Sequence, residues 1–173
     1  MPWKTTIKRA RADKRAGKSA STQAGEFVRE EIEKIRRGLT GARSPQQAIA
    51  IGLSQARRAG VDLPPPRTGR VKERTRKSAE YAYEAGQGKR KTQRQPRVAR
   101  AVTQVMKREP KSSASHRALS QQAKRAAARR GAASRKAAAR KAAHTKGRSG
   151  RVAAARKAAR TRKRQRKTGR RRA

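Results

Sequence analysis

Between Lys111 and Ala173 the chain carries 24 lysine or arginine residues and not one aspartate or glutamate. Like charges at this density repel one another and disfavour any compact state. The same 63 residues contain only two bulky apolar side chains, Leu119 and Val152. This segment therefore cannot build a hydrophobic core of its own, and the most direct reason for such a charge is a polyanionic partner.

The rest of the chain is also basic and poor in large apolar residues. The full 173 residues have a net charge of +42, and 34 of the residues counted as hydrophobic are alanine. Val, Ile, Leu and Phe together number 17, about half of the roughly 20% below which highly charged chains tend to be disordered. We expect a mostly α protein without a β-sheet: a small helical hairpin and short helices, with long disordered or conditionally helical basic flanks.

The segment 22–63 predicts that hairpin. Apolar residues recur at three- or four-residue steps after a cap at Ser21 or Thr22, and Gly38 suits the end of the first helix. Ser44-Pro45-Gln46-Gln47 has the pattern of a capping box with proline at the first helical position. Gly60 is placed to end the second helix, before three prolines.

Four regions follow from these signals. They are a basic N-terminal arm (1–20), the helical hairpin module (21–66), a linker with two short amphipathic helices at 78–85 and 97–109 (67–110), and the Ala/Lys/Arg-rich tail (111–173), in which Ser115 can cap one further helix.

The tail is repetitive. The heptapeptide Ala-Ala-Ala-Arg-Lys-Ala-Ala occurs at 137–143 and again at 153–159. Alanine favours helix, but cations that spread over every face leave no apolar stripe for docking. We expect the tail to be largely disordered alone and to become helical when phosphates neutralise its side chains.

These cations are the predicted nucleic-acid contacts, because non-specific binding needs many mobile positive charges rather than precise geometry. The predicted set is Lys124, Arg125, Arg129, Arg130, Arg135, Lys136, Arg140, Lys141, Arg156, Lys157, Arg160, Arg162, Lys163, Arg164, Arg170, Arg171 and Arg172, with Arg57 and Arg58 as secondary contacts. A helix-turn-helix that reads bases is a weaker alternative, because the connection from Gly38 to Ser44 is long; Gln46 and Gln47 would then join Arg57 and Arg58.

Other chemistry has little support. Cysteine is absent, which excludes disulfides and thiol catalysis. His116 and His144 lie in basic, solvated sequence, and the glutamates at 30, 31 and 33 suit ion pairs and the helix dipole. The longest apolar run, at 48–51, is far shorter than the roughly 20 residues of a membrane span, and Met1-Pro2-Trp3-Lys4 does not begin a secretory signal. We expect no enzymatic activity, no cofactor, no metal and no membrane association.

The stretches STQAGEFVREEI at 21–32 and GARSPQQAIAIGLSQARRAG at 41–60, followed by Pro64-Pro65-Pro66, resemble a family of small, highly basic bacterial proteins. Its members carry a domain of unknown function, and some are labelled plasmid stabilisation proteins. The resemblance covers residues 1 to about 125 and implies no binding residues. The label also implies a ribonuclease-type toxin built on an antiparallel sheet, for which this chain has no strands.

The Ala/Lys/Arg tail resembles those of linker histones and bacterial linker-histone-like proteins, which implies coating of DNA. The leading hypothesis is a cytoplasmic, nucleoid-associated, histone-like DNA-binding protein with little sequence preference. Two alternatives stay open: an RNA- or ribosome-associated basic protein, and an adaptor whose hairpin at 22–63 binds a protein partner or a second copy.

Overall fold

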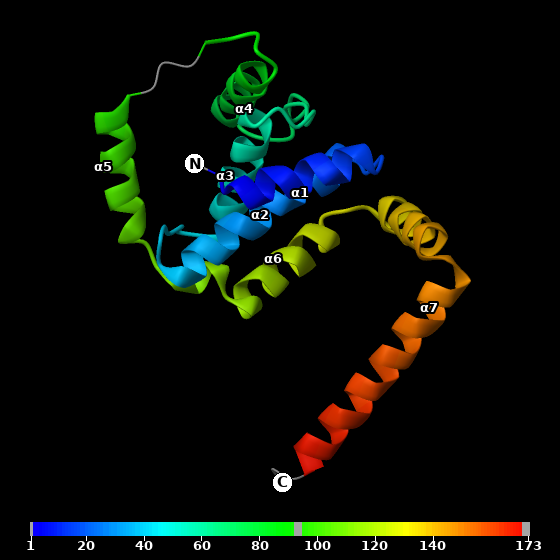
Figure 1. Ribbon diagram of the computed structural model, residues 1–173. Helices are drawn as coiled ribbons and strands as arrows, with labels where there is room; N and C mark the ends of the chain where they lie inside the picture. Colours follow the sequence, from blue (N-terminus) through cyan, green and yellow to red (C-terminus); the bar gives the residue numbers. More distant parts are fainter. Residues whose placement is uncertain (1, 92–94, 171–173) are drawn as a thin grey trace. The chain divides into compact units, whose positions relative to one another are not determined.

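The computed structural model describes residues 2–91 and 95–170, without the side chains of 145, 146 and 164–170. In these ranges the chain forms seven α-helices and one 3₁₀-helix (η1), with no strand. Figure 1 labels the α-helices along the chain. The helices are α1 (Lys4–Arg15), α2 (Ala20–Arg37), α3 (Pro45–Arg58), α4 (Glu73–Gly86), α5 (Pro96–Lys107), η1 (Lys111–Ala114), α6 (His116–Ala128) and α7 (Ala132–Arg170). The predicted mostly α fold is confirmed. The chain divides into a first unit ending at Ala123 and a second unit beginning at Lys124.

The α2–α3 hairpin is the centre of the first unit, as the sequence predicts. Both helices end on a left-handed glycine, with φ of 75° at Gly38 and 85° at Gly60. At Gly38 the backbone N–H groups of the glycine and of the next residue bond the carbonyls of Ile35 and Lys34 at 3.0 and 2.9 Å, which is the Schellman pattern. The same pattern recurs at Gly60.

One of the two helix starts in the hairpin differs from the predicted one. Helix α2 begins at Ala20, and its N-cap is Ser19 rather than Ser21 or Thr22. Helix α3 begins as predicted, with the Ser44 hydroxyl accepting the Gln47 backbone N–H at 3.2 Å. The Gln47 side chain reaches back one residue further than in a standard capping box and accepts the N–H of Arg43 at 2.9 Å.

The predicted N-terminal arm forms a helix that packs on α2. Ala10 of α1 is buried in one apolar cluster with Ala24, Phe27, Ala56 and Val61. The backbone N–H of Trp3 donates to both carboxylate oxygens of the buried Glu30, at 2.9 and 3.0 Å. The Trp3 ring lies beneath the Lys34 ammonium and the Arg37 guanidinium, at 5.3 and 5.5 Å from the ring centre. The residues before the hairpin therefore complete its core.

Residues 111–114, assigned from the sequence to the basic tail, also belong to the first unit. Ala114 is fully buried in a second apolar cluster with Ile35, Ala42 and Ala48. Its carbonyl accepts a hydrogen bond from Nε of Arg36 at 2.9 Å. The solvated basic tail consequently starts after this segment rather than at Lys111.

Glycines let the helices approach closely. A Cβ added to Gly52 of α3 would lie 2.6 Å from the Val28 Cα of α2. A Cβ on Gly86, at the end of α4, would overlap the Arg57 carbonyl of α3. Only glycine fits at such separations, and with glycine at these contacts a unit with few large apolar side chains can still pack densely.

Two helices have little or no packed face. The predicted helix at 97–109 is α5, which leaves Val98, Val102 and Val105 between 50% and 54% exposed. In α7 the described side chains are exposed apart from the partly buried Ala143, and Gly147 interrupts the helix with φ of 62°. Thus α7 has the all-round charge that the sequence predicts and no buried stripe.

We predict that Gly52→Ala lowers the free energy of unfolding by about 1–3 kcal/mol, because the new methyl group meets backbone atoms that cannot move aside. Urea unfolding followed by circular dichroism measures this. The matched control is Gly25→Ala, an exposed position within α2 whose Cβ would meet nothing within 4 Å; it should gain about 0.5–1 kcal/mol. Equal midpoints for both variants would contradict the close α2–α3 packing.

Candidate nucleic-acid interface

The predicted tail contacts are solvent-accessible wherever the structure describes them. Exposed side chains are Lys124, Arg125, Arg129, Arg130, Arg135, Lys136, Arg140, Lys141, Arg156, Lys157, Arg160, Arg162 and Lys163. The first two lie at the end of α6, the next two between α6 and α7, and the rest on α7. The predicted Arg164, Arg170, Arg171 and Arg172 fall outside the described side chains.

The second unit holds 22 lysine or arginine residues and no aspartate or glutamate in its 50 residues. No acidic side chain within it can neutralise these cations. Since they occur on every side of α7, the helix offers no single binding face. The arrangement suits attraction to a polyanion from any direction, and it lacks the fixed donor geometry that base recognition requires.

Arg57, predicted as a secondary nucleic-acid contact, has a structural role instead. It is only 7% exposed, and its guanidinium donates from Nε to the Leu63 carbonyl at 3.0 Å and from Nη2 to the Pro64 carbonyl at 3.3 Å. Burial lowers the pKa of this guanidinium from its ordinary value. These bonds hold the chain that follows α3 against the helix. The neighbouring Arg58 is exposed and stays accessible to a ligand.

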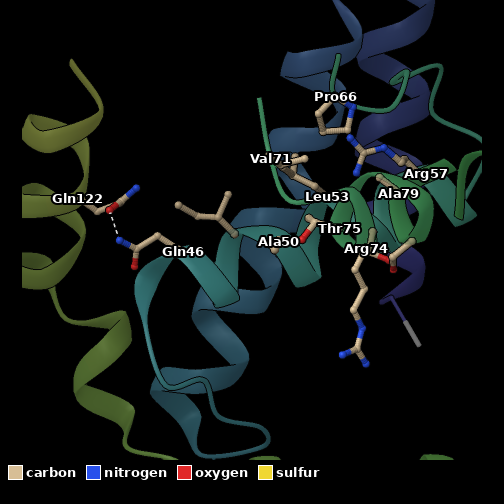
Figure 2. Close-up of a pocket in the computed structure, with 13 residues that line it drawn as sticks. Gln46, Ala50, Leu53, Arg57, Pro66, Val71, Arg74, Thr75, Ala79 and Gln122 are labelled. Atoms are coloured by element: carbon tan, nitrogen blue, oxygen red, sulfur yellow. Dashed lines mark hydrogen bonds between the residues drawn. The ribbon is translucent and has the colours of Figure 1, made fainter. Parts of the chain in front are cut away.

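The two glutamines of the base-reading alternative make hydrogen bonds within the first unit. Gln47 serves the α3 cap, and Nε2 of Gln46 donates to Oε1 of Gln122 in α6 at 2.6 Å, as Figure 2 shows. Base reading from the start of α3 would have to break both bonds. The structure therefore gives no support to a helix-turn-helix recognition helix.

A groove of about 500 Å³ lies along α3 and α4 in the first unit. Figure 2 shows apolar residues such as Leu53, Val71 and Ala79 around it, with Arg57 at one end and Arg74 turned away. None of the lining residues is a carboxylate or a histidine. The groove consequently offers contact area without an acid–base pair.

The glutamates at 30, 31 and 33 are engaged by neighbours. Glu30 is buried, binds the Trp3 N–H and forms an ion pair with Lys34. Glu31 accepts a hydrogen bond from Nε2 of Gln55 at 2.9 Å, and burial raises its pKa above the ordinary value. Glu33 pairs with Arg37. These contacts tie α1 and α3 to α2.

His116 and His144 are both exposed. No three histidine, aspartate or glutamate side chains in the described part of the chain come together as metal ligands. None of its helices combines the length and the apolar character needed to cross a membrane.

A family model, described as a family of unknown function (DUF6496), matches residues 11–67. The chain is similar to this family over the hairpin module. The match runs from within α1 through α2 and α3 to the proline run, a shorter span than the resemblance to residue 125 predicted, and it brings no activity with it. No curated protein and no solved structure matches the chain.

One basic surface was absent from the predicted contacts. Helix α1 carries Lys4, Lys8, Arg11 and Arg15 at steps of four, three and four residues. The periodicity is visible in the sequence, but a segment with so few large apolar residues does not predict a packed helix. Its burial against α2 is what turns these cations into one face.

We predict that Arg57→Gln lowers the free energy of unfolding by about 1–3 kcal/mol, because the buried Arg57 side chain loses its hydrogen bonds to the Leu63 and Pro64 carbonyls. Arg58→Gln, with the same loss of charge one residue later, should leave thermal unfolding unchanged. Once folded, Arg57→Gln should bind duplex DNA as the unaltered chain does, whereas Arg58→Gln lacks an accessible cation. A loss of affinity specific to Arg57→Gln, without loss of stability, would restore Arg57 as a contact.

Proposed function

We propose that this protein is a non-enzymatic DNA-binding protein that coats duplex DNA without sequence preference, as nucleoid-associated and linker-histone-like proteins do. The observation that carries the proposal is the second unit, whose 22 exposed or tail-borne cations have no acidic side chain among them. A duplex offers about one negative charge per 1.7 Å of its axis, which is the matching polyanion.

The binding mechanism is phosphate neutralisation with release of counterions. If about 6–10 of the tail cations contact phosphates, affinity should fall by about 10³–10⁵ between 50 and 200 mM salt. Neutralised side chains no longer repel one another, so the alanine-rich repeats can hold the helical conformation that they favour intrinsically. Binding and helix formation in the tail are then coupled, as in other segments that fold on their partner.

The aromatic residues favour duplex DNA over single-stranded RNA, whose readers stack unpaired bases on such rings. All four are occupied within the first unit. Phe27 is buried, Trp3 is covered by Lys34 and Arg37, Tyr81 lies 4.9 Å from the Arg90 guanidinium, and the Tyr83 hydroxyl donates to Asp62 at 2.7 Å. Unpaired bases would have to displace these partners.

The adaptor alternative requires the hairpin to leave apolar surface free for a partner. In the structure α1 covers one apolar face of the hairpin, residues 111–114 cover another, and α4 packs on α3. The hairpin at 22–63 therefore has less need of a protein partner or of a second copy. This supports DNA binding as the leading proposal.

Removal of the tail after Ala128 tests the proposal. This truncation deletes 20 lysine or arginine residues and leaves the buried Ala114 in place. Affinity for a 30-base-pair duplex at 150 mM salt should fall on the order of 10²–10³-fold, with a much weaker dependence on salt. Fluorescence anisotropy measures both quantities, and thermal unfolding of the truncated chain verifies that the first unit stays folded.

Undiminished affinity after the truncation would contradict the tail-centred mechanism. A competition between duplex DNA and structured RNA, at equal phosphate concentration and salt, decides between the two nucleic acids. If the RNA competes more strongly than the duplex DNA, RNA rather than DNA is the ligand. Crosslinking in cells, followed by sequencing of the bound nucleic acid, should recover DNA without a shared motif.

A further inference from the structure

Helix α1 carries a straight row of four cations, Lys4, Lys8, Arg11 and Arg15, all exposed. At about 100° per residue these positions fall within a narrow sector of the helix surface. Together with Ile7 they line a shallow depression that runs along the helix. The row is therefore a continuous surface feature and not a scatter of charges.

The opposite face of α1 fixes the row in place. Thr6 and Ala10, about half a turn away from the row, are only 4% and 5% exposed against the rest of the unit. The Trp3 N–H is held by Glu30 at the start of the helix. Beyond its end, the Lys18 carbonyl accepts a hydrogen bond from Nε2 of Gln23 at 2.8 Å. The four cations thus stand on a packed framework, unlike those of α7.

The cations of the row are also not neutralised by ion pairs within the described residues. Among the described residues, none of its four members forms an ion pair with a carboxylate, whereas arginines elsewhere in the first unit do so, for example Arg43 with Glu109 and Arg76 with Glu73. The acidic residue of α1 itself, Asp13, is paired with Lys18 at 2.7 Å. All four cations of the row are therefore available to an external anion, and they stand together on one packed helix.

We propose that this row is a second phosphate-binding surface, which lies along one strand of a DNA duplex and sets the orientation of the folded unit. The proposal rests on the DNA-binding function above. From Lys4 to Arg15 the helix rises about 16 Å, so the row is long enough to reach several phosphates of one strand, which lie roughly 3.4 Å apart along the duplex axis. Contacts to phosphates fix orientation but carry no base sequence.

The test uses the full chain with Lys4, Lys8, Arg11 and Arg15 all changed to Gln, which keeps the helix propensity high. The matched control changes four exposed cations of the same unit, Arg67, Arg70, Lys72 and Lys77, to Gln. The measurement is the slope of log affinity for duplex DNA against log salt concentration. Each lost phosphate contact reduces the steepness of the slope by about 0.9.

For the α1 variant we expect the slope to become shallower by about 2–4, and for the control by less than about 1. Equal changes in both variants would show that only overall charge matters and would overturn the proposal, as would an unchanged slope in the α1 variant. If the unaltered chain fails to bind duplex DNA, the proposed function fails instead, so the two failures are distinguishable.

A second readout does not depend on affinity. The chain contains no cysteine, so Lys8→Cys and Lys77→Cys each provide one attachment point for a photocrosslinker in the full chain. On bound duplex, position 8 should crosslink efficiently and position 77 should not. Equal yields at the two positions would contradict a fixed orientation of α1 on DNA.

Discussion

The distribution of ten carboxylates determines which part of this chain can fold. All ten lie in the first unit, where each has a partner: eight form ion pairs, Glu31 accepts a hydrogen bond from Gln55, and Asp62 accepts one from Tyr83. Exposed ion pairs contribute only about 0–1 kcal/mol each, but together they lower the repulsion among 30 basic residues. The tail has no such relief.

Glu30 is the carboxylate with the largest structural consequence. It is buried in α2, receives the Trp3 N–H from the start of α1 and pairs with Lys34, whose ammonium also lies over the Trp3 ring. One side chain therefore connects the N-terminal helix to the hairpin. The row of cations on α1 depends on this connection, because only a packed α1 presents them on one face.

Small residues fill most of the core of the first unit. Phe27 and Ile35 are the fully buried large apolar side chains of the described core, and alanines such as Ala24, Ala48 and Ala56 occupy most other buried positions. Alanine and glycine permit close helix approach at the expense of buried area per residue. The scarcity of large apolar residues predicts disorder for the whole chain. The few that are present are concentrated in the first unit, where they suffice for one small core.

The hairpin could be predicted from its sequence because its signals are local: caps at Ser44 and Gly38, and apolar residues at helical spacing. Helix α1 and residues 111–114 could not, because their burial depends on distant partners, Glu30 for Trp3 and Arg36 for Ala114. The prediction of Arg57 as a nucleic-acid contact was wrong for the same reason. Its guanidinium donates to two carbonyls of the segment after α3, and the sequence does not reveal this contact. The prediction that the tail cations contact nucleic acid needs only the composition of the tail, and it stays a prediction.

Hydrogen exchange of the full chain, free and bound to duplex DNA at low salt, tests the central claim that a folded first unit carries a tail that orders on DNA. The amides of α2 and α3 should be protected in both states. The amides of 132–163 should exchange at nearly unprotected rates in the free chain, because no buried face stabilises that helix, and should slow on binding. Protection of 132–163 without DNA, or no change at saturating DNA, would contradict the account.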